Sequence, residues 1–155
     1  MTYTIGVIDT TFARVDMAKV AIEVVTQHLP RAKIIRYTVP GIKDVVVACK
    51  KVLEEADIAI SFGWVGRSLI DKYSYLAASI GLTLVQILTG KHVIDVTVHE
   101  DEADSEEELY KIAVNRAQKH ALNLVILLTK GGEGLLPYAG MGLRQGYPDV
   151  GPIKR

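Results

Sequence analysis

The chain has 155 residues, 49% of them hydrophobic and 23% charged, which are proportions typical of a single soluble domain with its own core. The chain has 18 lysines and arginines together and 18 aspartates and glutamates together, so its formal net charge is zero. A neutral chain has no overall attraction for nucleic acid or for an anionic membrane surface. The first residues run directly into a strand pattern, with no apolar stretch suited to export or membrane spanning, and predict a cytoplasmic protein.

Strand and helix patterns alternate along residues 1–130, and this part of the chain is predicted to be one α/β domain. The strand patterns, short runs rich in valine and isoleucine, cover residues 3–8, 33–39, 57–62 and 92–98. The helix patterns cover residues 16–29, 43–55 and 69–88, and a longer one starts at Ser105. This order predicts a four-stranded parallel sheet, buried on both faces, between two layers of helices.

Ligands of such sheets bind beyond the carboxyl ends of the strands, which selects the segments that follow each strand. After the first strand, Phe12 stands in a polar turn where an aromatic ring has little to pack against, so a ligand-stacking role is favoured over a helix-entry contact. Asp9, beside two threonines and without a second acidic neighbour, is interpreted as a turn or helix-entry residue.

The second strand ends abruptly at Pro40-Gly41, with a helix pattern almost immediately after it. Proline has a fixed φ and no N–H, and glycine lets another group approach the backbone closely. The pair therefore makes either a sharp turn or a bare stretch of backbone that faces a ligand. After the third strand, Gly63 and Gly66 flank Trp64 without any phosphate-binding glycine motif, and Trp64 either lines the site or caps the core.

His99 follows the last apolar residue of the fourth strand, at the same edge, and histidine exchanges protons near neutral pH. The acidic residues after it lead into a helix whose Ser105 and Glu108 predict a capping box. His120 lies on a helix pattern and is interpreted as solvated. Cys49, on an apolar helix face, is expected in the core, and no spacing in the sequence predicts a zinc site.

Four strings carry a resemblance to a known family: IDTTFARVDMA (8–18), TVPGIKDVVVACKK (38–51), VHEDEADS (98–105) and GLRQGYPDVGP (142–152). They resemble archaeal-type riboflavin synthase, a family related to lumazine synthase, and the similarity covers nearly the whole chain. The resemblance implies flavodoxin-like subunits in a homopentamer with active sites between neighbours. It also implies the reaction of two 6,7-dimethyl-8-ribityllumazine molecules to riboflavin and 5-amino-6-ribitylamino-pyrimidinedione.

The resemblance implies roles for the residues at the sheet edge. Phe12 stacks on the heterocycle, Asp44 accepts hydrogen bonds from ribityl hydroxyls, and the wall beside the ribityl chain comes from Pro40, Gly41 and Ile42. A further part of the substrate site is formed by Gly63, Trp64 and Val65, where the archaeal riboflavin synthases are expected to carry Met-Pro in place of Trp64-Val65.

The implied reaction starts with loss of an acidic proton from the C7 methyl group of one lumazine, and the resulting carbon nucleophile attacks the second lumazine. Orientation of the two rings supplies much of the catalysis, and no organic cofactor is expected. His99 is the expected group for proton transfer. Glu100 and Asp101 are interpreted as ring or ribityl contacts, or as ligands of a magnesium ion.

Residues 131–155 contain seven glycines and three prolines, so they are not expected to continue the long helix, and composition alone predicts a disordered tail. The resemblance includes this segment, and residues 142–146 are expected to fold over a neighbouring subunit or the substrate. The helix pattern at 69–88 has a patch of small residues, Ala77, Ala78, Ser79 and Gly81, and is expected at a subunit contact.

Two other functions stay open. A lumazine synthase would need a phosphate-handling threonine and histidine after the third strand, which residues 67–71 do not provide. A non-catalytic ligand-binding domain would share the same fold.

Overall fold

The computed structural model of the chain describes residues 2–154, and its strands form one parallel sheet in the order β2-β1-β3-β4. The strands are β1 (Thr4–Thr10), β2 (Lys33–Val39), β3 (Ile58–Val65) and β4 (Val93–His99). The helices are α1 (Met17–His28), α2 (Val45–Val52), α3 (Leu69–Thr89) and α4 (Glu106–Leu135). Three short 3-10 turns are η1 (Ile42–Asp44), η2 (Glu100–Glu102) and η3 (Leu136–Tyr138). The predicted four-stranded parallel α/β architecture is confirmed.

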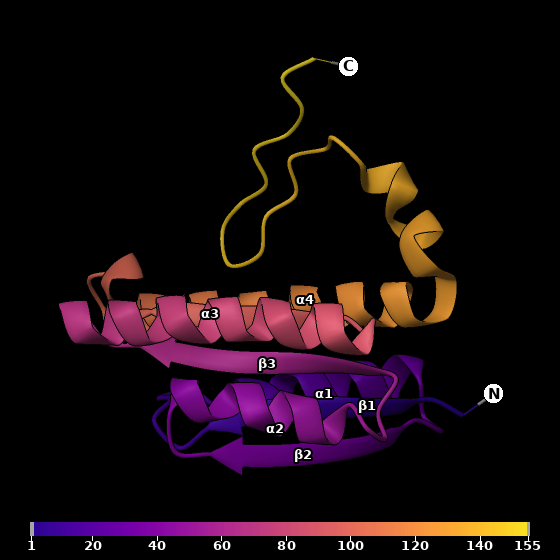
Figure 1. Cartoon of the computed structure of the whole chain (residues 1–155). Helices are drawn as coiled ribbons and strands as arrows, with labels where there is room; N and C mark the ends of the chain where they lie inside the picture. Colours follow the sequence, from indigo (N-terminus) through magenta and orange to yellow (C-terminus); the bar gives the residue numbers. More distant parts are fainter. Residues whose placement is uncertain (1, 155) are drawn as a thin grey trace.

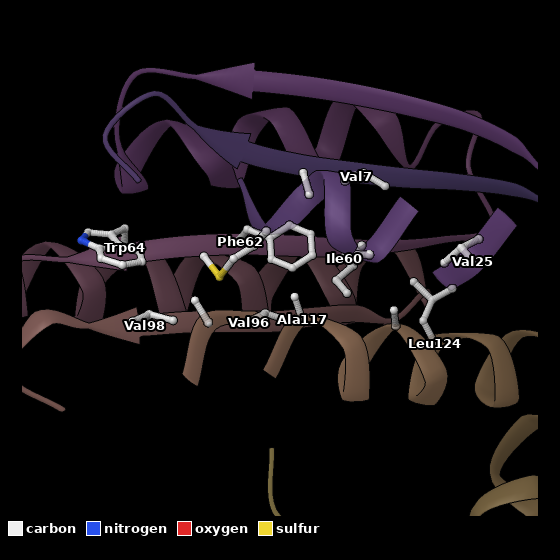
Figure 2. Close-up of a cluster of buried hydrophobic side chains, with 14 of the residues drawn as sticks. Val7, Val25, Ile60, Phe62, Trp64, Val96, Val98, Ala117 and Leu124 are labelled. Carbon is white, nitrogen blue, oxygen red and sulfur yellow. The ribbon is translucent and has the colours of Figure 1, made fainter. Parts of the chain in front are cut away.

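The helices cover both faces of the sheet and enclose two hydrophobic clusters (Figure 1). Helices α1 and α4 close one cluster, in which Phe62 of β3 lies among side chains from β1, β4 and both helices (Figure 2). Helices α2 and α3 close the other, which contains Cys49, as expected for a small core residue. The two layers therefore leave the carboxyl ends of the strands as the edge where loops meet.

Side-chain caps start three of the helices close to the predicted positions. Asp16 accepts a hydrogen bond from the backbone N–H of Lys19 at 3.1 Å and caps α1. Ser68 caps α3, and Ser105 caps α4 by accepting from the N–H of Glu108 at 3.1 Å. Each cap satisfies one of the backbone donors that a helix start leaves without a partner. Among residues 2–154, no helix is long and apolar enough to cross a membrane.

Two strands are longer than predicted, and this changes where some candidate residues lie. β1 continues to Thr10, so Asp9 lies within the strand and accepts hydrogen bonds from Arg36 and Thr38, both at 2.6 Å. β3 continues to Val65, so residues 63–65 belong to a fully buried strand and not to the loop after it. The prediction that all strands are buried on both faces is wrong for β2, which is an edge strand with only Val39 buried.

The segment after residue 130 is ordered against α4, contrary to the expectation from composition. Helical geometry breaks at Gly131, where φ is 63°, but helical turns resume and extend to Leu135, so the expected end of the helix is a kink. The chain then folds back: Arg116 Nε donates to the carbonyl of Gln145 at 3.1 Å, and the N–H of Gly146 donates to Asn115 Oδ1 at 2.9 Å. Figure 1 shows this segment in yellow, turning back toward α4. Residues 144–147 thus contact their own chain.

Candidate functional site

A cavity of about 240 Å³ opens at the carboxyl ends of β1, β2 and β3, and we call it the Phe12 cavity. Its lining residues are Phe12, Gly41, Ile42, Lys43, Asp44, Trp64, Asp71 and Ser74. Phe12 is 50% exposed, so its ring is available to a ligand and is not committed to the core. Five of the residues expected at the substrate site therefore meet in one cavity, joined by the first turns of α3.

The Pro40-Gly41 turn presents its backbone to the Phe12 cavity. The chain turns at the end of β2, where Thr11 N–H donates to the carbonyl of Val39 at 2.9 Å and Thr11 Oγ1 donates to that of Pro40 at 3.3 Å. Gly41 has an extended backbone, with φ −143° and ψ 171°, so left-handed geometry is not what requires a glycine here. The absence of a side chain leaves its backbone open to the cavity, while Pro40 itself lies exposed outside the lining.

Asp44 occupies the 3-10 turn that follows, with its carboxylate on the cavity side. Its Oδ2 accepts a hydrogen bond from Gly41 N–H at 3.3 Å, which holds the carboxylate over the turn. A carboxylate offers about four acceptor positions, so this contact leaves capacity for ligand hydroxyls.

Trp64 separates the Phe12 cavity from a second cavity. It is 2% exposed, and its Nε1 donates to Glu100 Oε1 at 2.9 Å. In Figure 2 it stands at one end of the row of core side chains, with its nitrogen pointing away from that row. The second cavity, of about 320 Å³, which we call the Arg14 cavity, is lined by Arg14, Val15, Trp64, Glu106, Glu107, Leu109 and Tyr110. Trp64 therefore both caps the core and lines the site, the two readings that its sequence left open.

Gly63 and Val65 do not line either cavity. Val65 is buried in the core. A Cβ on Gly63 would lie 2.8 Å from Thr97 Oγ1 and 2.9 Å from Ile42 Cδ1, so the glycine lets β3, β4 and η1 approach closely. Gly63 thus shapes the Phe12 cavity from behind, by admitting Ile42.

His99 is the last residue of β4 and lies against the first turns of α3. Its Nδ1 is 3.0 Å from Lys72 Nζ, and its ring meets that of Tyr75 edge-on, with centroids 5.1 Å apart and planes at 87°. Burial lowers the pKa of His99 below its ordinary value, and the positive charge of Lys72 lowers it further. His99 is outside the lining of the Phe12 cavity of its own chain.

The three acidic residues of η2 point to three different partners. Glu100 accepts from Trp64 and lies 3.5 Å from Arg14 Nη1. Asp101 accepts from Lys72 at 2.8 Å, and Glu102 accepts from Arg116. Because each carboxylate faces its own donor, they do not converge on one point, and residues 2–154 contain no group of three His, Cys, Asp or Glu side chains able to hold a metal ion.

Glu102 and Arg116 form the most buried ion pair described in the chain. Arg116 donates to both carboxylate oxygens, at 2.9 and 2.8 Å, and to the carbonyl of Thr97 at 2.8 Å. Glu102 also accepts from the N–H of His99 and from the hydroxyl of Tyr147, each at 2.8 Å. Burial by itself raises the pKa of Glu102, but these hydrogen bonds outweigh it and lower the pKa to about 2.

His120 differs from the expectation of a solvated side chain. It lies half-buried on α4, and burial together with the charge of Arg116 lowers its pKa to about 4. His120 is thus neutral at pH 7 and belongs to the packing of α4.

Sequence reasoning missed Lys72, Tyr75, Tyr110 and Arg116, which surround the candidate residues. The signal for two of them was available: the first turns of a helix that follows a strand lie at the same edge as the end of that strand. Lys72 and Tyr75 occupy such turns of α3. Tyr110 and Arg116 lie one to three turns into α4, and no local pattern marks them.

Comparisons with known proteins agree on one family. The family model described as 6,7-dimethyl-8-ribityllumazine synthase matches residues 2–130. The chain is 62% identical over 151 residues to riboflavin synthase of Aeropyrum pernix, covering 97% of both chains. It is 52% identical to riboflavin synthase of Archaeoglobus fulgidus, covering 96% of this chain and 97% of that one. It is 48% identical to the Methanothermobacter thermautotrophicus protein of the same name, covering 96% and 98%.

Proposed function

The chain belongs to the 6,7-dimethyl-8-ribityllumazine synthase family, in the branch of the archaeal-type riboflavin synthases, and we propose that it is itself a riboflavin synthase. The proposed reaction joins two 6,7-dimethyl-8-ribityllumazine molecules and gives riboflavin and 5-amino-6-ribitylamino-pyrimidinedione. The observation that carries the proposal is the Phe12 cavity, in a chain 62% identical to a riboflavin synthase. The cavity offers an exposed aromatic ring, an open backbone and a carboxylate on adjacent elements.

Each of these groups suits one part of the substrate. The ring of Phe12 offers a flat apolar face to a flat heterocycle, which aromatic groups contact by offset stacking. The backbone at Gly41 and the carboxylate of Asp44 offer polar contacts to a polyhydroxylated side chain. The proposal assigns the ring to Phe12 and the ribityl chain to the wall formed by Pro40, Gly41 and Ile42, with Asp44 as its acceptor.

The size of the cavity supports a site shared between subunits. Cavities that enclose a single ligand of drug size hold roughly 300–1,000 Å³. The Phe12 cavity, at about 240 Å³, is too small to enclose two lumazines, and His99 does not reach into it. We therefore include in the proposal a neighbouring subunit that closes the cavity and brings its own residues to it, in a homopentamer.

Helix α3 supplies the surface for that contact. Six large apolar residues recur along one face of the helix, and no other described residue of the chain buries them. They are 54–73% exposed: Leu69, Tyr73, Leu76, Ile80, Leu84 and Ile87. Contiguous apolar faces of this kind mark subunit interfaces. The small residues expected there lie partly elsewhere: Ala78 is buried, and Gly81 lies against Val46 of α2, where a Cβ would come within 2.8 Å. Large apolar side chains thus form most of the exposed face, and of the small patch Ala77 is exposed.

The catalytic step of the proposal uses side chains of the protein and no organic cofactor. His99 is the group for proton transfer, and its lowered pKa keeps the imidazole neutral at pH 7. Glu100 and Asp101 lie beside it in η2 as contacts for the ring or the ribityl chain. Alignment of the two rings contributes most of the rate, since well-oriented reactions gain about 7–11 kcal/mol from proximity.

The purified chain with 6,7-dimethyl-8-ribityllumazine as the only substrate tests the proposal. Riboflavin formation, followed by absorbance, is the expected result. Binding of the lumazine without turnover would indicate a ligand-binding domain. Product formation only from the pyrimidinedione and a four-carbon phosphate would indicate a lumazine synthase. Light scattering in the same buffer measures the assembly, and a monomer at working concentration would contradict the shared site.

Phe12→Ala tests the ring assignment. Stacking is worth roughly 0.5–1.5 kcal/mol beyond the area that it buries, so lumazine affinity falls while the melting temperature stays close to that of the parent. Tyr138→Ala is the matched control, because Tyr138 is an aromatic residue of equal 50% exposure outside the Phe12 cavity. Equal loss of affinity in both variants would remove Phe12 from the site.

A further inference from the structure

Lys72 makes two contacts that together fix the end of its side chain. Its Nζ lies 3.0 Å from Nδ1 of His99, and 2.9 and 2.8 Å from the two carboxylate oxygens of Asp101. The carboxylate thereby holds the ammonium group in place beside the imidazole. Lys72 also hydrogen-bonds through its backbone N–H to the carbonyl of Ser68 in the first turn of α3, so the base of the side chain is held as well.

The contact with Lys72 determines which nitrogen of His99 carries the proton. An ammonium group has three donors and no acceptor, so at 3.0 Å Nδ1 must accept the hydrogen bond. A neutral imidazole that accepts at Nδ1 carries its proton at Nε2. Within residues 2–154, Nε2 has no hydrogen-bond partner, and the edge-on ring of Tyr75 limits rotation of the imidazole plane.

The charged groups around His99 favour this neutral form. Burial has the largest effect on its pKa and lowers it, and Lys72 of α3 lowers it next. The carboxylates of Glu102 and Asp101 in η2 raise the pKa, and Arg116 of α4 lowers it. The net direction is downward, so the imidazole is neutral at pH 7 and Nε2–H remains a donor.

We propose that Lys72 is a positioning residue for His99, which fixes Nε2–H as the donor presented to the ligand in the site that the neighbouring subunit completes. The inference rests on the proposed function and specifies the direction of its proton transfer. With Nδ1 occupied, His99 begins the reaction as a hydrogen-bond donor or acid toward an oxygen or nitrogen of the bound ring, and not as the base for the methyl proton.

Transfer of that proton would be balanced within three groups: the ligand atom, the imidazole of His99 and the ammonium of Lys72. When the bond between Nε2 and its proton breaks and the ligand atom gains the proton, Nδ1 takes a proton from the ammonium of Lys72. The imidazole stays neutral throughout, and Lys72 ends the step as a neutral amine. The return of a proton from the product side restores the ammonium, so each turnover leaves the three groups unchanged.

The tautomer can be measured on the unaltered chain by NMR of the ring nitrogens in a histidine-labelled sample at pH 7, with His99→Gln to assign the signals. The expected result is a proton on Nε2 and none on Nδ1. A proton on Nδ1 of His99 overturns the proposal without any substitution at Lys72. Because this measurement needs no substrate, it tests the inference separately from the proposed function. A parent chain that makes no riboflavin would contradict the proposed function, and the measured tautomer of His99 would still hold.

Three variants test the role of Lys72: Lys72→Met, which removes the donor and the charge, Lys72→Arg, which keeps both, and Lys111→Met. Lys111 is an exposed lysine of α4 paired with Glu107, so its replacement makes the same change in net charge at a distance from His99. Lys72→Met is expected to raise the pKa of His99 toward its ordinary value in an NMR titration. Lys72→Arg and Lys111→Met are expected to leave it near that of the parent.

Turnover gives the second measurement. A misplaced catalytic group costs on the order of 10²-fold in rate, so Lys72→Met is expected to lose about that much in kcat with a smaller change in KM. Lys72→Arg is expected to restore the pKa of His99 but little of the rate, because a guanidinium group does not give up the proton that Nδ1 takes. Lys111→Met is expected to keep the parent rate. A Lys72→Met chain that keeps both the parent pKa of His99 and the parent kcat would overturn the proposal.

Discussion

The turn η2 has two sides that differ in burial, although their carboxylates are neighbours in the sequence. On the side toward α3, Asp101 holds Lys72 beside His99, with its side chain 47% exposed. On the side toward α4, Glu102 holds Arg116 with its side chain 17% exposed, and is tied to the C-terminal segment through Tyr147. The α4 side is a closed network, whereas the α3 side ends in an imidazole nitrogen, Nε2, that has no hydrogen-bond partner among residues 2–154.

The difference shows that neighbouring residues of one acidic segment have different roles: Glu102 stabilises the fold, and Asp101 acts on the proposed chemistry. A buried ion pair is costly to break, because the remaining charge is left without compensation, and an exposed pair adds little to stability. The α4 side therefore anchors η2, and the N–H of His99 that donates to Glu102 is part of that anchor. The α3 side can be altered with the fold intact, and its effects are expected in the chemistry.

Glu102→Gln is the variant with the largest expected effect on stability. Loss of one partner leaves Arg116 charged and buried, and the free energy of unfolding is expected to fall by on the order of 3 kcal/mol. Urea unfolding at fixed protein concentration measures it, with Glu107→Gln as a control in an exposed ion pair on α4. Equal urea midpoints for the two variants would show that the Glu102–Arg116 ion pair contributes no more to stability than the exposed Glu107–Lys111 pair.

The same anchor predicts a loss of stability in acid. The pKa of Glu102 is about 2 in the folded chain against 4.5 as its ordinary value, so its stabilising contribution is complete above about pH 4.5 and is lost as the pH falls toward 2. Unfolding midpoints measured from pH 6 down to pH 2 should fall more steeply in the parent than in Glu102→Gln. Parallel curves for the two chains would contradict the lowered pKa.

Tyr147→Phe tests whether the C-terminal segment belongs to the α4 side. It removes one hydrogen bond to Glu102 and keeps the ring that lies under Arg116 and Arg144, whose guanidinium carbons are 5.4 and 4.7 Å from its centroid. The expected loss is about 1 kcal/mol, with faster proteolysis after residue 140. A segment cleaved at the same rate in parent and variant would mean that the hydroxyl does not hold it.

Asp101→Asn is expected to have the smallest effect on stability, with a urea midpoint equal to that of the parent, because its ion pair with Lys72 is exposed. The amide carries no negative charge to balance the positive charge of the Lys72 ammonium. The two quantities expected to change are therefore the occupancy of the proton on Nε2 of His99 and the rate of riboflavin formation. A large drop in the midpoint without a change in rate would reverse the comparison between the two sides of η2.

The sequence predicted the α/β order, the sheet type and the edge at which the candidate residues lie, because these follow from short-range period and from general rules for parallel sheets. It did not predict where β3 ends, since Gly63-Trp64-Val65 has the composition of a loop and is buried through contacts with β4, α4 and Ile42 of η1. Nor did it separate Glu100, Asp101 and Glu102, whose partners come from α3, α4 and β3. Composition also failed for residues 144–147, because a few hydrogen bonds to Asn115 and Arg116 order a segment that glycine content describes as disordered.

Trp64 is the one tryptophan in the chain, and it stands between the Phe12 cavity and the Arg14 cavity. Its intrinsic fluorescence therefore originates at a single place, where an indole held by Glu100 borders both cavities. A heterocycle bound in the Phe12 cavity is expected to quench that emission by energy transfer, because the buried indole borders the cavity. The wall between the cavities is thus also a built-in optical reporter, which reads the occupancy of the site with no added label.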